Sequence, residues 1–145
     1  MKIVKVTFVK GFSAFYFDDQ AAVKAGATQD GFIYEGKPIT GGFKSVRQAG
    51  ECISVLLHLE NGHIARGDCV AVQYSGASGR DPVFIGDTYI SFLRNNIAPL
   101  LLGLCVDRFI PNSRYFDELI VSGNPMHTAI RYGISQALLD ATALA

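Results

Sequence analysis

ISVLLHLENGHIARGDCVAV, residues 53–72, is the stretch that decides the fold. Two apolar, strand-like runs lie on either side of the Asn-Gly pair at positions 61–62, and this arrangement is the strongest short-range signal for a β-hairpin. A polar, glycine-rich segment follows the second run and reaches as far as Pro82. We therefore expect two paired strands, with a loop suited to binding a small molecule at the end of the second strand.

The expected register of the hairpin would place charged side chains on the apolar face of the sheet. Pairing Glu60 with His63 across the turn would place Arg66 and Asp68 on the apolar face. Charged side chains there predict either that this face is partly hydrated or that Gly67 forms a β-bulge.

The apolar spacing outside the hairpin predicts one more strand and three helices. Residues 2–9 alternate between apolar and polar side chains, as a half-buried strand does. Helical spacing runs from a cap at Asp87 to Pro99, then around residues 115–120, then from a cap at Asn124. The last helix has Pro125 at its first position and its apolar residues at three- and four-residue steps: Ala129, Ile130, Gly133, Ile134, Ala137, Leu138 and Ala141.

Residues 10–50, between the first strand and the hairpin, are rich in glycine and aromatic residues. A connection of this length is normally functional or disordered, and we interpret it as lid loops. Asp18 or Asp19 is suited to capping a short helix that ends before Gly26.

Strands first and helices after them predict an α+β fold, with a three-stranded antiparallel meander followed by a helical layer. At this length, residues 1–145 form one domain with its own core. The last residues are strong helix formers without a stop signal, so we expect the chain to be cut inside or just after its final helix.

The composition argues against several classes of partner. Thirteen basic and thirteen acidic residues cancel, without a basic block, which argues against nucleic acid and membrane surfaces. The three cysteines lack CxxC spacing and the first residues do not form a signal peptide, so we expect a cytoplasmic protein with reduced thiols. With 49% hydrophobic and only 18% charged residues, some apolar surface is expected to lie against a partner.

Gln73 is the main candidate for chemistry, because it lies where the second hairpin strand ends. Its amide can accept a hydrogen bond from an ammonium group and donate one to a carboxylate. The alternative is an amide that only stabilises the loop. Arg80 and Asp81 could bind a carboxylate, although adjacent opposite charges more often form a local pair. The histidines and cysteines lack metal-ligand spacing.

Several long strings identify a family. They are MKIV, AFYFDDQAAVKAGA, DGFIYEG, GFKSVRQAGECISVLL, GDCVAVQYSGASGRDP and HTAIRYGISQALLDA, in this order. With them the chain resembles the amino-terminal domain of methylaspartate ammonia-lyases, which belong to the enolase superfamily. The resemblance implies the α+β cap domain of that superfamily, whose loops close over the mouth of a following (β/α)-barrel.

The resemblance also implies an activity and its residues. Enzymes of this family interconvert L-threo-3-methylaspartate with mesaconate and ammonia. Gln73 matches a residue near the substrate amine, and Tyr74 continues the same loop, so both are expected to bind substrate. The barrel supplies the catalytic and metal-binding groups, so this chain is expected to hold neither and to be inactive alone. The implied ions are Mg²⁺ and, as a second candidate, K⁺, both bound by the barrel, and the complete enzyme is expected to be a homodimer.

A second hypothesis stays open beside the cap of an ammonia-lyase. The chain could be a non-catalytic module that binds a small molecule or a protein and keeps the cap fold. A cap could occur as an excised domain, a truncated gene product or one subunit of a split enzyme. The coding sequence downstream of Ala145 would separate these hypotheses, because the first requires a barrel.

Overall fold

The computed structural model of the chain describes residues 1–71, 76 and 79–145, except for the side chain of Asp19. The elements, in chain order, are β1 (Ile3–Phe17), α1 (Asp19–Lys24), β2 (Thr28–Asp30), β3 (Ile33–Glu35), β4 (Arg47–Leu59), β5 (Ile64–Val70), α2 (Gly86–Phe92), the π-helical turn η1 (Leu93–Ile97), α3 (Ala98–Leu101), α4 (Phe109–Asp117), β6 (Ile120–Val121), β7 (Asn124–Pro125) and α5 (Thr128–Leu144).

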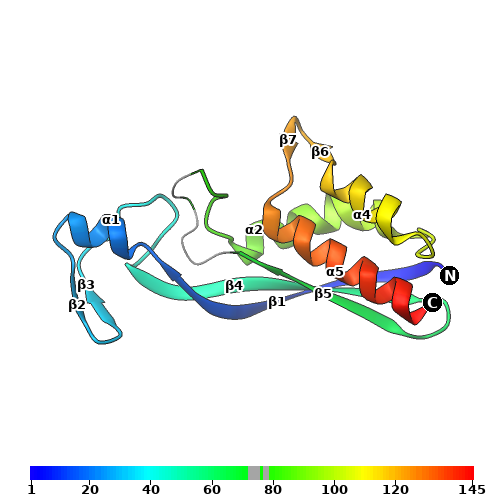
Figure 1. Cartoon of the computed structure of the whole chain (residues 1–145), viewed down its shortest axis with the longest axis horizontal. Coiled ribbons are helices and arrows are strands. Elements are labelled where there is room, and N and C mark those ends of the chain that lie inside the picture. Colours follow the sequence, from blue (N-terminus) through cyan, green and yellow to red (C-terminus); the bar gives the residue numbers. More distant parts are fainter. Residues whose placement is uncertain (72–75, 77–78) are drawn as a thin grey trace.

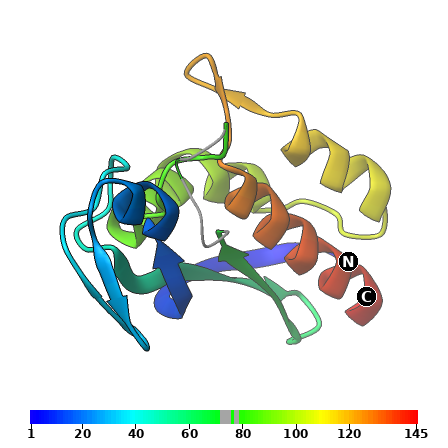
Figure 2. The same cartoon turned by 60° about the vertical axis from the view of Figure 1, so that its left-hand side comes forward.

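The main sheet is antiparallel with the order β1-β4-β5. Helices α2, α4 and α5 lie on one side of this sheet, while α1, β2 and β3 form a lobe at the far end of the molecule (Figures 1 and 2). The α+β class and the three-stranded meander with its helical layer are therefore confirmed. The chain termini lie together at the end opposite the lobe (Figure 1).

The hairpin has a different register from the expected one. The amide of Leu59 donates to the carbonyl of His63 at 2.9 Å, so residues 60–62 form the loop. Gly62 has a φ of 88°, the left-handed conformation that ends a three-residue hairpin loop. The expected pairing of Glu60 with His63 is wrong, because a third residue enters the turn.

This shift by one residue removes the conflict of polarity. Arg66 lies opposite Leu56 and Asp68 opposite Ser54, on the face of the sheet that points away from the helices. The alternate residues of β5 face the core, where Ala65 and Cys69 are completely buried. Neither a hydrated core face nor a bulge at Gly67 is needed.

Gly67 has another role, because α5 packs directly on the backbone of β5. A Cβ atom at Gly67 would overlap the carbonyl oxygen of Gly133 and lie 2.5 Å from the amide nitrogen of Ala137. Conversely, a Cβ atom at Gly133 would lie 2.6 Å from Sγ of Cys69. Two glycines thus let a helix and a strand approach more closely than side chains would permit.

The apolar face predicted for α5 is confirmed at every position. Its buried residues are Ala129, Ile130, Gly133, Ile134, Ala137, Leu138 and Ala141. The start of the helix was wrong, however. Asn124 and Pro125 pair with Ile120 and Val121 as a short ladder, and α5 begins at Thr128.

The helix predicted from Asp87 to Pro99 is interrupted. The amide of Gly86 donates a hydrogen bond to the carboxylate of Glu51 at 2.5 Å, so a side chain of β4 accepts from the first amide of α2. Pro99 does not end the helical region, since it lies in the first turn of α3, where an amide hydrogen is not required. The π-helical turn η1 makes the transition from α2 to α3.

Residues 10–50 contain more regular structure than lid loops alone. β1 continues to Phe17, and α1 agrees with the predicted short helix. The lobe has a small core of its own, formed by Ala22, Ala27 and Val46 with Tyr34 packed against it. Whether this lobe acts as a lid stays a prediction.

Asp18 holds the lobe together instead of capping α1 with its side chain. Its buried carboxylate accepts hydrogen bonds from the amides of Ile39 and Thr40 and from the hydroxyl of Thr40. Burial raises the pKa of the Asp18 carboxyl, but the hydrogen bonds from Thr40 and Ile39 outweigh burial and leave the pKa below its ordinary value. Asp18 is therefore ionised at neutral pH.

Among the described residues, no helix is both long and apolar enough to span a membrane.

Replacing Gly67 by alanine is expected to destabilise the chain by about 1 to 3 kcal/mol, the usual cost of overpacking. The added methyl group would push α5 off β5. Denaturant unfolding measures the loss, and Gly41→Ala, at a position with open space around it, is the matched control. Equal stability of Gly67→Ala and wild type would show that α5 does not need this close approach.

Replacing Asp18 by alanine is expected to loosen the lobe by about 1 to 3 kcal/mol, because two backbone amides lose their acceptor. Since the folded pKa of Asp18 is lowered, this stabilisation is complete above the ordinary value of 3.8 and is lost as the pH falls through the folded value. Hydrogen exchange at Thr40, as an opening free energy, measures the difference between wild type and variant.

That difference should stay constant from neutral pH down to about pH 5 and shrink below the ordinary pKa. Asp30→Ala, at an exposed position of β2, is the control. A difference that persists undiminished at pH 2 would contradict the role of the ionised carboxylate.

Candidate functional site

The candidate site lies where β5 ends and the chain returns over the start of α5. Gln73 and Tyr74, the predicted substrate-binding residues, lie outside the described residues, so their roles stay predictions. The stems on either side are described: β5 ends at Val70, and the returning stem runs through Asp81 and Pro82. We therefore build the site from the groups that hold these stems.

His127 joins the returning stem to α5. Its Nδ1 accepts a hydrogen bond from the amide of Ala129 at 3.0 Å, and its Nε2 lies 3.0 Å from the carbonyl oxygen of Pro82. Because Nδ1 accepts, the ring hydrogen resides on Nε2 and is donated to Pro82. The edge of the ring contacts Phe84 and Tyr89, with centroid distances of 5.2 Å to each. The imidazole is thus held in one tautomer.

Asp81 binds the same helix start. Its carboxylate accepts from the amide of Thr128 at 2.6 Å and lies 3.6 Å from Nδ1 of His127. Burial raises the pKa of Asp81, but hydrogen bonds from Thr128 and the nearby charge of Arg131 outweigh burial and lower it overall. The Asp81 carboxylate thus bonds the backbone at the start of α5, and none of the ion pairs between described residues joins it to Arg80, so the expected local pair is not found.

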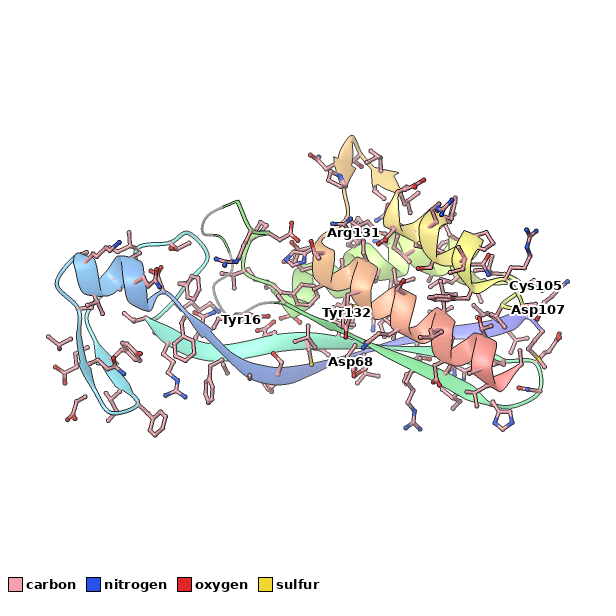
Figure 3. All side chains as sticks on the ribbon, viewed as in Figure 1. Tyr16, Asp68, Cys105, Asp107, Arg131 and Tyr132 are labelled. Carbon is pink, nitrogen blue, oxygen red and sulfur yellow. The ribbon has the colours of Figure 1, made fainter. Side chains whose placement is uncertain are left out.

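A cavity of about 380 Å³ opens between the end of β5, the returning stem and α5. Its lining residues are Val70, Ala71, Gly79, Arg80, Asp81, His127, Thr128, Ala129 and Tyr132. Tyr132 points from α5 toward β5, whereas Arg131 lies on the opposite side of the helix, toward α4 (Figure 3). A cation, a carboxylate and apolar walls make this cavity chemically suited to a small polar molecule.

A second cluster of polar side chains lies near the start of α2, on the side of the sheet that carries the helices. Nζ of Lys10 lies 2.9 Å from Asp87 and 3.6 Å from Glu51, and Glu51 also accepts from Gly86. The hydroxyl of Tyr16 donates to the carbonyl of Glu51, and burial raises the pKa of Tyr16 to about 12. These contacts join β1 and β4 to the start of α2.

The residues present do not fit a metal ion. Within residues 1–71, 76 and 79–145, no three histidine, cysteine, aspartate or glutamate side chains gather closely enough to bind one. Cys69 is buried, which raises the pKa of its thiol to about 12 and keeps it neutral.

Sequence reasoning considered His127 only as a metal ligand and so missed its role. No local pattern marks the role, because its acceptor is the carbonyl of Pro82, 45 residues earlier in the chain. The contact exists only once α5 lies on β5.

The comparisons with known proteins agree over the whole chain. The family model "Methylaspartate ammonia-lyase N-terminus" matches residues 1–145. The chain is 64% identical to methylaspartate ammonia-lyase of Citrobacter amalonaticus over 145 residues, and 56% identical to that of Clostridium tetanomorphum over 143 residues. The two matches cover 100% and 99% of this chain but only 35% of each relative. The chain therefore spans about a third of the length of these relatives.

Solved structures show the same similarity. The Citrobacter amalonaticus enzyme containing (2S,3S)-3-methylaspartic acid matches with a TM-score of 0.93 and 64% identity, over 99% of this chain and 35% of that one. The Mg-complex of β-methylaspartase from Clostridium tetanomorphum matches with a TM-score of 0.94 and 56% identity over the same shares. The L-Ala-D/L-Glu epimerase of Bacillus subtilis, at 13% identity and a TM-score of 0.56, shares the fold alone. By sequence and fold, the chain belongs to the methylaspartate ammonia-lyase family, of which it is the amino-terminal domain.

Proposed function

We propose that this chain is the cap of an enzyme that converts L-threo-3-methylaspartate to mesaconate and ammonia, and that its loop at residues 72–78 helps to bind the substrate. The observation that carries this proposal is the match of all 145 residues to the amino-terminal domain of the family. A relative at 64% identity was solved with (2S,3S)-3-methylaspartic acid. A (β/α)-barrel, in the same polypeptide or in a partner, is proposed to complete the enzyme.

Gln73 is proposed to orient the amino group that leaves the substrate. Its carbonyl oxygen accepts a hydrogen bond from the ammonium group, and the neutral amide keeps this function at any pH at which the enzyme works. Tyr74 is proposed to form a wall of the same site. The rigid stems around Val70 and Asp81 support this role, since binding loops are usually positioned by a rigid scaffold.

Proton transfer and metal binding are proposed to lie on the barrel. Burial keeps Tyr16 and Cys69 protonated at neutral pH, and Lys10 is engaged in ion pairs with Glu51 and Asp87. One relative was solved as a Mg-complex, and Mg²⁺ would stabilise the negative charge that develops on the substrate carboxylate. Since the described residues of this chain hold no cluster for a metal ion, we propose that Mg²⁺ binds outside it, and we propose no role for K⁺.

The lobe formed by α1, β2 and β3 is proposed to cover the barrel mouth. It projects away from the helical layer (Figure 1) and carries large exposed apolar side chains, with Phe32 at 83% and Ile33 at 66% exposure. Such surface normally lies against a partner. The resemblance alone supports a homodimer, and the three free cysteines support a reducing, cytoplasmic location.

The chain alone is expected to form no mesaconate from 3-methylaspartate in the presence of Mg²⁺, because its described residues gather no three side chains that could bind the metal ion. Absorbance of mesaconate measures the product, with the complete enzyme as the positive control. Product above a heat-inactivated blank would place catalysis in this chain. An inactive complete enzyme would instead favour a binding module.

Replacing Gln73 by alanine in the complete enzyme is expected to lower kcat/KM for 3-methylaspartate by roughly 10- to 150-fold. The change deletes a hydrogen bond to a charged group, worth about 1.5 to 3 kcal/mol. Gln136→Ala is the control, because that amide bonds the backbone of Asp68 and lies in the middle of α5. We expect kcat/KM to fall in Gln73→Ala and to stay unchanged in Gln136→Ala.

The same variant should accept bulkier amines in the reverse addition to mesaconate, since removing a side chain relaxes rejection by shape. Initial rates with ammonia and methylamine measure this change. Unchanged constants for both nucleophiles would make Gln73 a loop-stabilising residue.

A further inference from the structure

We propose that His127 is a positioning residue for the ammonia-lyase reaction: it clamps the stem at Pro82 onto α5 and thereby fixes the described end of the segment that carries Gln73. The inference rests on the proposed function of Gln73. His127 itself is not proposed to touch the substrate.

The two ring nitrogens of His127 serve two different elements. Nδ1 accepts from the amide of Ala129 and so caps its own helix, whereas Nε2 donates to the carbonyl of Pro82 in the returning stem. Both nitrogens are thus engaged, and the side chain is only 4% exposed. A histidine engaged in this way fixes the two elements that it joins relative to each other.

Aromatic rings keep the imidazole in place. Phe84 and Tyr89 stack on each other at 4.6 Å, and each contacts the histidine ring edge-on. Phe84 belongs to the stem and Tyr89 to α2. The ring cannot turn without opening this stack, so the Pro82 carbonyl has a fixed donor.

One further hydrogen bond joins the clamped stem to Gly76. Asp81, the neighbour of Pro82, accepts at its carbonyl oxygen from the amide of Gly76 at 2.6 Å. Gly76 follows Gln73 by only three positions. A shift of Pro82 would therefore move Asp81 and Gly76, and a small displacement of a substrate-binding group is costly in rate.

Two substitutions can separate the two hydrogen bonds of His127. In His127→Asn the short amide still accepts from Ala129, since asparagine is a good helix cap, but it cannot reach Pro82. In His127→Gln the longer amide places a donor nitrogen near the position of Nε2 and keeps the bond to Pro82, while the cap is lost. Both lose the imidazole ring, so each is the control for the other. His58→Gln, on the face of the sheet away from the helices, controls for the loss of a histidine elsewhere.

The clamp is tested first without any substrate, in the complete enzyme. In His127→Asn the amide of Gly76 should exchange its hydrogen faster, while the amide of Ala129 should stay protected. The opposite pattern is expected in His127→Gln. Unchanged exchange at Gly76 in His127→Asn would overturn the clamp, whatever the enzyme proves to catalyse.

The positioning role is tested next by kinetics. His127→Asn should lower kcat/KM for 3-methylaspartate by about 2- to 12-fold, as expected for one hydrogen bond, and His127→Gln should restore most of this loss. His58→Gln should not change it. If His127 acts through Gln73, the effect of His127→Asn should largely vanish in a Gln73→Ala background.

The outcomes separate the two proposals. Additive effects of His127→Asn and Gln73→Ala, or equal losses in both His127 variants, would reduce His127 to a stabilising residue. Wild-type enzyme without ammonia-lyase activity would overturn the proposed function and with it the kinetic role, while hydrogen exchange at Gly76 would still decide whether the clamp exists.

Discussion

The contact between α5 and β5 governs the geometry of this domain, because here a helix rests on the backbone of a strand. Gly67 and Gly133 face each other without side chains, and the apolar stripe of α5 closes the core over the sheet. One consequence is local and functional. The first turn of α5 comes to lie beside the end of β5, where His127 and Asp81 can hold the returning stem. Packing in the core thus determines where the two stems on either side of residues 72–78 lie.

The polar groups at this end of the domain are engaged with the backbone of neighbouring elements. Asp81 accepts a hydrogen bond from Thr128, and both ring nitrogens of His127 have backbone partners. Tyr16 and Cys69 keep their protons at neutral pH because burial raises their pKa values. A domain with these properties is suited to present a substrate to catalytic groups on another domain, which is the division of labour proposed for this family member.

Features that depend on neighbouring residues could be read from the sequence. The hairpin, the antiparallel meander and the α+β class follow from alternating runs around an Asn-Gly turn, and the buried face of α5 follows from its three- and four-residue spacing. Features that depend on distant partners could not. The predicted register of the hairpin was wrong because a third residue enters the turn. The predicted start of α5 was wrong because Asp81 and His127 accept from the amides of Thr128 and Ala129.

The sequence by itself determined the family, the type and order of most elements, and the segment that carries Gln73. Local periodicity and turn chemistry suffice for these, because each is a property of residues close together in the chain. Only the tertiary structure decided three hydrogen bonds. Glu51 accepts from the first amide of α2, Asp18 accepts from the amide of Thr40 in the lobe, and His127 donates to the carbonyl of Pro82. Each of these bonds joins residues distant in sequence, and burial makes it necessary, since a polar group removed from water must find its partner within the fold.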